Sequence, residues 1–183
     1  FVFLALLKIK LPQQIYLLRG KDEIENVNSM YGLSEDCMKL YGHYGLWLLF
    51  NEAFNFLPIA AVIDKKIFCV HSGISPRINF IGQISSYYRA NVDYGSPIYD
   101  LFWSVPDNFT SDFIKDTRSP GYFFGKNATL SFLYNNGLIK RSCNYMQDVR
   151  KDPRHGFIVR SPQFTDNGFE WLHGFNVVTI WSA

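Results

Sequence analysis

A β-hairpin pattern near the middle of the chain restricts the fold more than any other sequence feature. Two short runs of β-branched and other apolar residues, 59–63 and 67–70, are separated by the polar turn 64–66. Runs of this kind around a polar turn predict two antiparallel strands. The second run leads directly into His71, so a titratable side chain is expected just beyond the end of a strand.

Segments with helical and strand-like patterns alternate along the rest of the chain. Apolar residues recur at helical spacing between Ser34 and Phe56, where Gly42 and Gly45 are expected to separate two helices. Further helices are predicted at 78–88 and 128–134, further strands at 14–18, 157–159 and 177–181, and a loop-rich stretch at 97–121. This mixture predicts an α/β (α+β layered) domain whose site lies at the ends of strands.

The apolar start of the chain, Phe1–Leu7, does not have the properties of a membrane span. Lys8 and Lys10 follow it, it is too short to cross a bilayer, and it has neither a basic leading region nor a cleavage site. We interpret it as the end of a buried helix, and the chain, which lacks an initiator methionine, as a fragment. No membrane association is expected.

Composition excludes several other classes of protein. The 183 residues are 48% hydrophobic, which suits one cored domain. The formal net charge is +2, with no long basic run, so no nucleic-acid partner is expected. The three cysteines are far apart and form no CxxC pair, which argues against a thiolate zinc site and for reduced thiols in a cytoplasmic or nuclear protein.

Five segments together resemble the serine/threonine protein phosphatases of the phosphoprotein phosphatase (calcineurin-like metallophosphoesterase) family. The family motif Leu-Arg-Gly-Asn-His-Glu corresponds to Leu18-Arg19-Gly20-Lys21-Asp22-Glu23. The other matching segments are Phe56–Asp64, Lys66–Pro76, Asp100–Asp107 and Arg118–Gly125. The ending, Asn167–Trp171 and Val177–Ala183, resembles the type 2A branch.

The resemblance implies a metallo-dependent phosphatase fold, a β-sandwich flanked by helices, with residues 1–183 forming an incomplete catalytic domain. The family's first two metal-binding motifs, Gly-Asp-x-His-Gly and Gly-Asp-x-Val-Asp-Arg-Gly, are absent from this sequence. We therefore expect the N-terminal part of the domain to be missing.

The resemblance also implies a chemistry that this sequence has altered. The family uses two divalent metals (manganese, iron or zinc) that polarise the phosphate and supply a hydroxide. Lys21 replaces the asparagine ligand and has no lone pair to offer. Asp22 replaces the histidine that acts as general acid, and an ionised carboxylate repels phosphate. His71 is kept as a metal ligand, and Arg118 is kept either as a phosphate-binding residue or as a salt-bridged loop arginine.

The position of the family's last histidine ligand depends on the alignment register. Arg141-Ser142-Cys143 resembles the family's Arg-Ala-His, but Arg160-Ser161-Pro162 stands at the family's own spacing from the C-terminal motifs. In the second register, which we choose, Pro162 replaces the ligand and residues of about 139–155 form an insertion loop. Cys143, His155 and His173 are then expected to be ordinary surface or loop residues.

These replacements favour a catalytically inactive pseudophosphatase that acts as a protein-binding or regulatory paralogue. No catalytic residue is then intact and no cofactor is expected in this chain. Phosphoproteins or regulatory-subunit-like proteins are the possible partners. Two alternatives stay open. One is an active phosphoserine/phosphothreonine phosphatase, if the missing motifs precede Phe1, and the other is a non-functional gene fragment.

Overall fold

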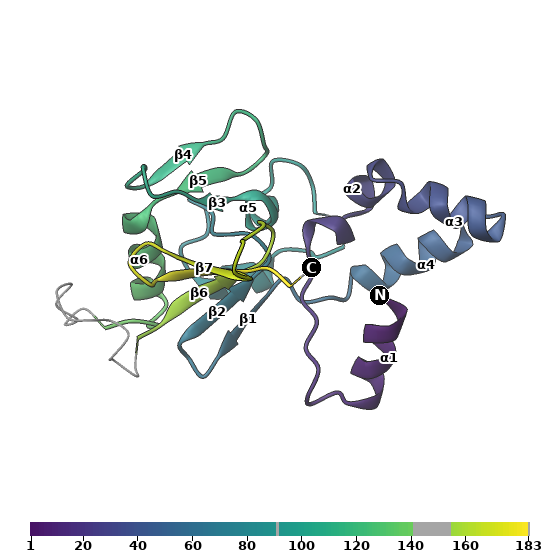
Figure 1. The fold of residues 1–183 in the computed structure, drawn as a ribbon, viewed down its shortest axis with the longest axis horizontal. Helices are drawn as coiled ribbons and strands as arrows, with labels where there is room; N and C mark the ends of the chain where they lie inside the picture. The colour runs from purple at the N-terminus through teal and green to yellow at the C-terminus, as the bar shows by residue number, and fades with distance from the viewer. Residues whose placement is uncertain (91, 141–154, 183) are drawn as a thin grey trace. The chain divides into compact units, whose positions relative to one another are not determined.

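The computed structural model describes residues 1–90, 92–140 and 155–182 (Figure 1). The chain divides into two compact units, 1–59 and 60–183, and each is described by itself. No helix in the described ranges is both long and apolar enough to cross a membrane.

The first unit is helical throughout its regular structure. Its elements are α1 (Val2–Lys10), the 3-10 helix η1 (Lys21–Glu23), α2 (Glu25–Met30), α3 (Leu33–Tyr41) and α4 (Gly45–Phe54). Gly42 ends α3 with a φ of 76°, in the left-handed region that glycine adopts at low cost. The predicted break between two helices at this glycine is confirmed.

Buried amide side chains connect α2 to α4 within the first unit. The amide nitrogen of Asn28 donates to Asn51 Oδ1 at 2.7 Å, and the Trp47 indole donates to Asn28 Oδ1 at 2.7 Å. Asn51 in turn donates to the Trp47 carbonyl at 3.0 Å. Polar groups buried with their partners satisfied specify one packing arrangement, because any shift leaves a donor or acceptor unpaired.

Two expectations for the first unit are wrong. Residues 14–18 do not form a strand, because a strand requires a neighbouring strand and the unit's described residues contain none. The segment at the start of the chain is a helix, as predicted, but it is not buried. Phe3 and Ile9 of α1 are 70% and 77% exposed, and α1 contains no buried residue.

The second unit is built on a five-stranded sheet in the order β1-β2-β6-β8-β7 (Figure 1). Its strands are β1 (Ala60–Ile63), β2 (Ile67–Val70), β6 (Phe157–Arg160), β7 (Phe169–Leu172) and β8 (Val177–Ile180). The antiparallel β1–β2 hairpin confirms the prediction, as do the strands at 157–159 and 177–181. The central strands β2, β6 and β8 run parallel, so their carboxyl ends meet at one edge of the sheet.

A smaller sheet and two helices complete the second unit. The sheet has the order β3-β5-β4, formed by β3 (Val105–Pro106), β4 (Phe113–Lys115) and β5 (Tyr122–Phe124). The helices are α5 (Pro97–Trp103) and α6 (Lys126–Asn135). Helix α6 confirms the helix predicted at 128–134 and is longer than predicted. The expected loop at 97–121 therefore contains a helix and two strands, all too short to show a periodic pattern.

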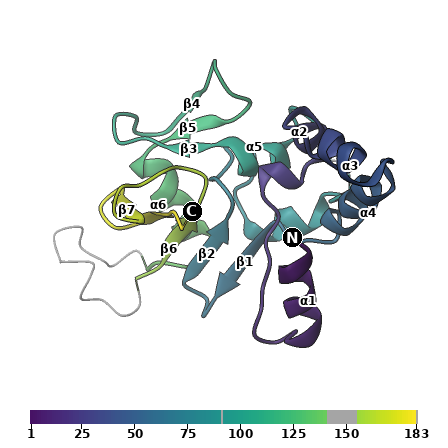
Figure 2. The ribbon, with the colours of Figure 1, turned by 45° about the vertical axis from the view of Figure 1, so that its right-hand side comes forward.

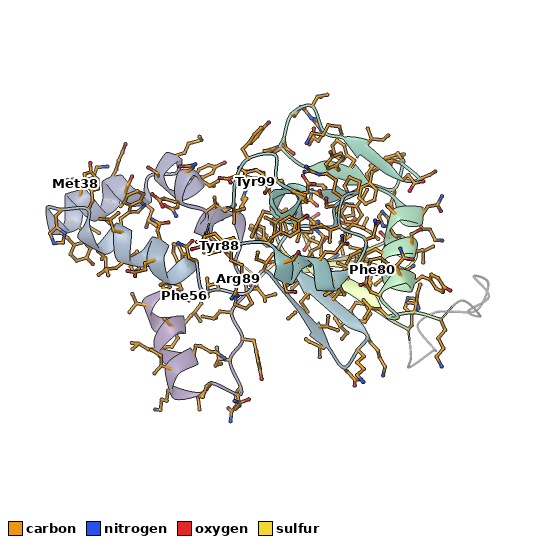
Figure 3. The ribbon with its side chains drawn as sticks, turned by 180° about the vertical axis from the view of Figure 1, so that it is seen from behind. Met38, Phe56, Phe80, Tyr88, Arg89 and Tyr99 are labelled. Carbon is orange, nitrogen blue, oxygen red and sulfur yellow. The ribbon has the colours of Figure 1, made fainter. Side chains whose placement is uncertain are left out.

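The helix predicted at 78–88 is a 3-10 helix, η2 (Ile81–Ser86). Phe80 and Tyr88 flank its two ends (Figure 3). Both of these side chains are exposed. Within η2 itself, Ile84 is the one residue that is buried in the core. One apolar anchor explains why the element is short and 3-10, since the burial of an apolar face supplies most of the stability of a helix in a protein.

His173 connects three elements of the second unit. It lies in the β7–β8 turn, a loop position as expected, but it is buried rather than on the surface. Its Nδ1 and the Thr129 hydroxyl of α6 are 2.8 Å apart, and its Nε2 lies 3.2 Å from the Asp107 carbonyl. The carbonyl can only accept, so neutral His173 carries its hydrogen on Nε2, and its Nδ1 is an acceptor beside the Thr129 hydroxyl, which also donates to the Gly125 carbonyl at 3.2 Å.

Burial lowers the pKa of His173 below its usual value of 6.5, although the Asp107 carbonyl opposes this effect. Below about pH 6.5, His173 binds a proton more readily in the unfolded chain than in the folded chain. The free energy of unfolding therefore falls as the pH drops. We expect the free energy of unfolding from urea denaturation to decrease between about pH 7 and pH 5.

The matched variant for this pH dependence is His173→Asn. Asparagine tolerates the left-handed backbone at this position, where φ is 52°, and does not titrate in this range. The variant should be less stable but should show a flatter pH profile. An unchanged slope would assign the pH dependence to other groups.

Candidate functional site

The candidate site of the second unit lies where the parallel strands β2 and β6 end. His71 follows β2 directly, and its carbonyl accepts a hydrogen bond from the Ser161 amide at 3.0 Å. The next residue after Ser161 is Pro162, so the structure brings His71 and Pro162 into adjacent loops. The half-buried His71 ring lies 6.3 Å from the Phe102 ring of α5.

Arg160, at the end of β6, was named only as part of a motif, and its supporting role in this site was not predicted from the sequence. Its side chain is buried, and its Nε donates to the carbonyl of Ser72. Its Nη1 donates to Gln163 Oε1 at 2.5 Å and to Thr179 Oγ1 of β8 at 2.9 Å. Burial lowers the pKa of Arg160 to about 9, which leaves it a cation at neutral pH.

The three bonds of Arg160 fix the loop that carries His71 to the neighbouring strand ends. The alternation of buried and less buried positions along β6 is the signal from which sequence analysis could have predicted a buried Arg160. Its inward positions, Ile158 and Arg160, are both buried, so a cation occupies a place where an apolar side chain is expected. A buried arginine is tolerated where carbonyl and hydroxyl oxygens accept its hydrogen bonds.

The loop after His71 is held against the end of α5. The backbone amides of Ser72 and Gly73 both point to the Leu101 carbonyl, at 3.1 and 3.2 Å. The Ser72 hydroxyl donates to the Ser104 carbonyl at 2.7 Å in a buried position. A Cβ on Gly73 would lie 2.4 Å from the Phe124 ring and 2.6 Å from the Ser104 oxygen, so only glycine fits there.

Ser104 also holds the loop that carries Arg118. Its hydroxyl accepts from the Tyr122 amide at 3.2 Å, while a Cβ on Gly121 would meet the backbone of Trp103 and Ser104 at 2.4 to 2.6 Å. The end of α5 therefore connects the His71 loop to the Arg118 loop. These two predicted site residues belong to loops that share one support.

The Arg118 side chain is 82% exposed. Its Nε lies 3.8 Å from Asp116 Oδ1, and its guanidinium lies 5.9 Å from the centre of the Phe123 ring. The hydrogen bond from the Arg118 amide is the main cause that lowers the pKa of Asp116. Arg118 is thus accessible to an anion from solution, and a carboxylate at this distance offsets part of its charge.

Lys21 and Asp22 belong to the first unit, in a loop whose frame is closed by hydrogen bonds. The Glu23 carboxylate accepts from the Gly20 amide at 2.7 Å, and Arg19 Nη2 donates to the Glu23 carbonyl at 2.9 Å. Burial raises the pKa of Glu23, and the bond from Gly20 opposes that rise. Asp22 is exposed, and Lys21 Nζ lies 5.9 Å from the Tyr31 ring centre.

The side chains at the strand-end site do not fit a pair of divalent metals. Zinc, iron and manganese need imidazole, carboxylate or thiolate donors, and His71 is the one such donor among the described residues that follow β2 and β6 directly. Pro162 has no donor atom, and the neighbouring guanidinium of Arg160 cannot ligate a metal. Across the described ranges, no three histidine, cysteine, aspartate or glutamate side chains are grouped to hold a metal ion.

The remaining predictions concern residues near the proposed insertion. The proposed insertion loop, residues of about 139–155, lies almost entirely outside the described residues, because 141–154 are not described. The insertion loop and the surface or loop position of Cys143 therefore stay predictions. His155 is half-buried next to the start of β6. Cys37 and Cys69 are free thiols.

Comparison with known proteins agrees with the two-sheet architecture and with the motifs. The family model for calcineurin-like phosphoesterases matches residues 2–140. The chain therefore belongs to the calcineurin-like phosphoesterase family.

Two curated relatives are serine/threonine phosphatase catalytic subunits. A protein phosphatase 2A catalytic subunit of Dictyostelium discoideum is 35% identical over 181 residues, which is 98% of this chain and 53% of the relative. The serine/threonine-protein phosphatase 6 catalytic subunit of Caenorhabditis elegans is 35% identical over 97% of this chain and 49% of its own length. The chain spans about half the length of these relatives.

A solved structure shows the same fold. A protein serine/threonine phosphatase from Saccharomyces cerevisiae, described as similar to human phosphatase PP5, superposes with a TM-score of 0.81 at 23% identity. The match covers 98% of this chain and 51% of that structure. The mixed α/β metallophosphatase fold predicted from the sequence is confirmed.

The Ser72 hydroxyl provides a direct test of how the His71 loop is supported. Ser72→Ala leaves the buried Ser104 carbonyl without this donor, so we expect a loss of about 1–3 kcal/mol in the free energy of unfolding. Ser86→Ala removes an exposed hydroxyl that donates to the Gln83 carbonyl and should change stability by less than about 0.5 kcal/mol. Equal effects of the two variants in urea denaturation would contradict this role.

Proposed function

We propose that this chain is a relative of the serine/threonine phosphatases that has lost hydrolysis and acts by binding proteins in the cytoplasm or nucleus. The observation that carries the proposal is the pairing of the His71 and Pro162 loops at the ends of β2 and β6. Two adjacent strand ends offer one imidazole and one side chain that cannot ligate, and one protein ligand does not hold a metal pair.

The first unit supports the proposal independently. At a separation of about 4 Å and an effective dielectric constant near 20, a lysine ammonium repels a dication by roughly 8 kcal/mol. Asp22 stands where the family motif has the histidine that protonates the leaving alkoxide, and it is exposed to solvent. The surrounding frame of Arg19, Gly20 and Glu23 keeps its hydrogen bonds. The changes therefore affect chemistry more than folding.

Partner binding is the function that remains when the fold is kept without the chemistry. Phosphoproteins and regulatory-subunit-like proteins are the partners that this origin favours, with Arg118 as an exposed group for an anion. The free thiols of Cys37 and Cys69 are consistent with a reducing compartment.

We expect the purified chain to bind less than stoichiometric manganese by elemental analysis. We also expect no manganese-dependent hydrolysis of a phosphothreonine peptide above background, because the donors for a metal pair are lacking. His71→Ala should leave both readings unchanged. Manganese-dependent hydrolysis that His71→Ala abolishes would contradict the proposal.

The replaced residues can be tested apart from the chain's length by placing them in a relative. The Dictyostelium protein phosphatase 2A catalytic subunit should receive Lys, Asp and Pro at the positions aligned with Lys21, Asp22 and Pro162. Loss of a general acid alone typically costs about 100-fold or more in rate, so a larger loss is expected for all three. A folded triple variant that keeps its activity would favour the active-enzyme alternative for this chain.

A further inference from the structure

A shallow hollow lies at the edge of the smaller sheet in the second unit. Its volume is about 220 Å³, and it is lined by Asp107, Phe109, Thr110, Ile114 and Phe123. Ile114 of β4 and Phe123 of β5 stand directly opposite each other in the antiparallel pairing, so their side chains share one face of the sheet. The hollow is therefore built on a cross-strand apolar pair, with the loop 107–110 as its rim.

Two of the three apolar side chains that line this hollow are exposed to solvent. Phe109 is 99% exposed and Ile114 is 58% exposed. Single exposed apolar residues are ordinary on protein surfaces, and here two of them stand beside one hollow at a sheet edge.

The backbone of β4 offers an edge for a further strand. β4 is the outermost strand in the order β3-β5-β4, and Figures 1 and 2 both show it beyond β5. The Gly125 amide donates to the Asp112 carbonyl, and the Asp116 amide donates to the Gly121 carbonyl. Asp112 and Asp116 are thus hydrogen-bonded to β5 or its ends, and in an antiparallel pair every second residue is bonded in this way. The amide and carbonyl of Ile114 therefore face β5, whereas those of Phe113 and Lys115 face outward.

The charge at the hollow indicates what an added strand would carry. The Asp107 carboxylate accepts from the Thr110 amide at 2.8 Å and takes part in none of the ion pairs described for residues 60–140. Lys115 donates to the Pro120 carbonyl and lies over the Tyr122 ring, 4.4 Å from its centre. Arg118 Nε lies 3.8 Å from Asp116 Oδ1. A lysine or arginine from a partner would complement Asp107.

We propose that the outer edge of β4 binds an extended peptide segment of a partner protein. The segment adds a strand to β4, places an apolar side chain in the hollow beside Ile114 and places a lysine or arginine near Asp107. Backbone pairing supplies affinity, and the hollow and the carboxylate supply sequence preference. This proposal deepens the protein-binding half of the proposed function and does not depend on the loss of hydrolysis.

The test is a selection of random dodecapeptides displayed on phage against the 183-residue chain, with counter-selection on Ile114→Lys. Ile114 is exposed, so the variant should fold, which a melting curve checks. We expect enriched peptides in which apolar residues alternate with polar ones and a lysine or arginine is present. A synthetic copy of the most enriched peptide should bind Ile114→Lys at least about tenfold more weakly by fluorescence anisotropy.

Asp107→Asn keeps an acceptor for the Thr110 amide but removes the charge. It should weaken the peptide by about threefold or more and reduce the dependence of binding on salt. Val62→Lys is the matched control, because Val62 is also exposed on an edge strand, β1, of the other sheet. It should leave binding unchanged.

Several outcomes would overturn the proposal. One is a selection that enriches no peptide dependent on Ile114, and another is equal binding to the Asp107→Asn, Ile114→Lys and original chains. A third is self-association by sedimentation that Ile114→Lys abolishes, which would make a second copy the occupant. Phosphopeptide hydrolysis is measured separately, so an active chain that still binds these peptides would refute the lost hydrolysis and leave the docking site standing.

Discussion

The parallel pairing of β2, β6 and β8 is the constraint on which the rest of the second unit depends. Parallel strands end at the same edge of a sheet, so every loop that leaves this edge starts beside its neighbours. The hydrogen bond from the Ser161 amide to the His71 carbonyl continues the β2–β6 pairing beyond the strands themselves. Arg160 then extends the connection to β8 through Thr179.

The end of α5 gives this edge a second support. The carbonyl and hydroxyl of Ser104 hold the loops of Ser72 and Tyr122. Gly73 and Gly121 approach the same backbone so closely that no side chain fits. These contacts involve no side chain at a position that the family motif gives to a metal ligand, so residues at such positions can change while the contacts persist.

Sequence reasoning predicted the parts of the fold that leave a local signal. The β1–β2 hairpin was predicted because its turn residues, Asp64 and Lys65, separate two apolar runs, and both adopt the left-handed backbone of a tight turn. The helix break at Gly42 was also predicted, because glycine interrupts a stretch of apolar residues with helical spacing there. The strand expected at 14–18 was wrong because strand formation depends on a partner, which a local run of apolar residues does not reveal.

The same distinction applies to the site. His71, Pro162, Lys21 and Asp22 could be named as candidates because a motif has a fixed spacing along the chain. Arg160 and Ser104 were missed as supports because their contacts are 88 and 32 residues away in the sequence. The hollow at β4 was also missed, because β4 and β5 have three residues each and show no period.

Pro162 also has a consequence for the proposed loss of hydrolysis. A proline fixes its own backbone torsion and restricts the residue before it, which here is Ser161. A single change to histidine would add a donor atom but would also free this segment of backbone, while Lys21 would still stand where the family motif has an asparagine. Under the proposed loss of the metal site, its recovery would thus need changes at more than one position, because a new donor at position 162 would leave Lys21 as it is.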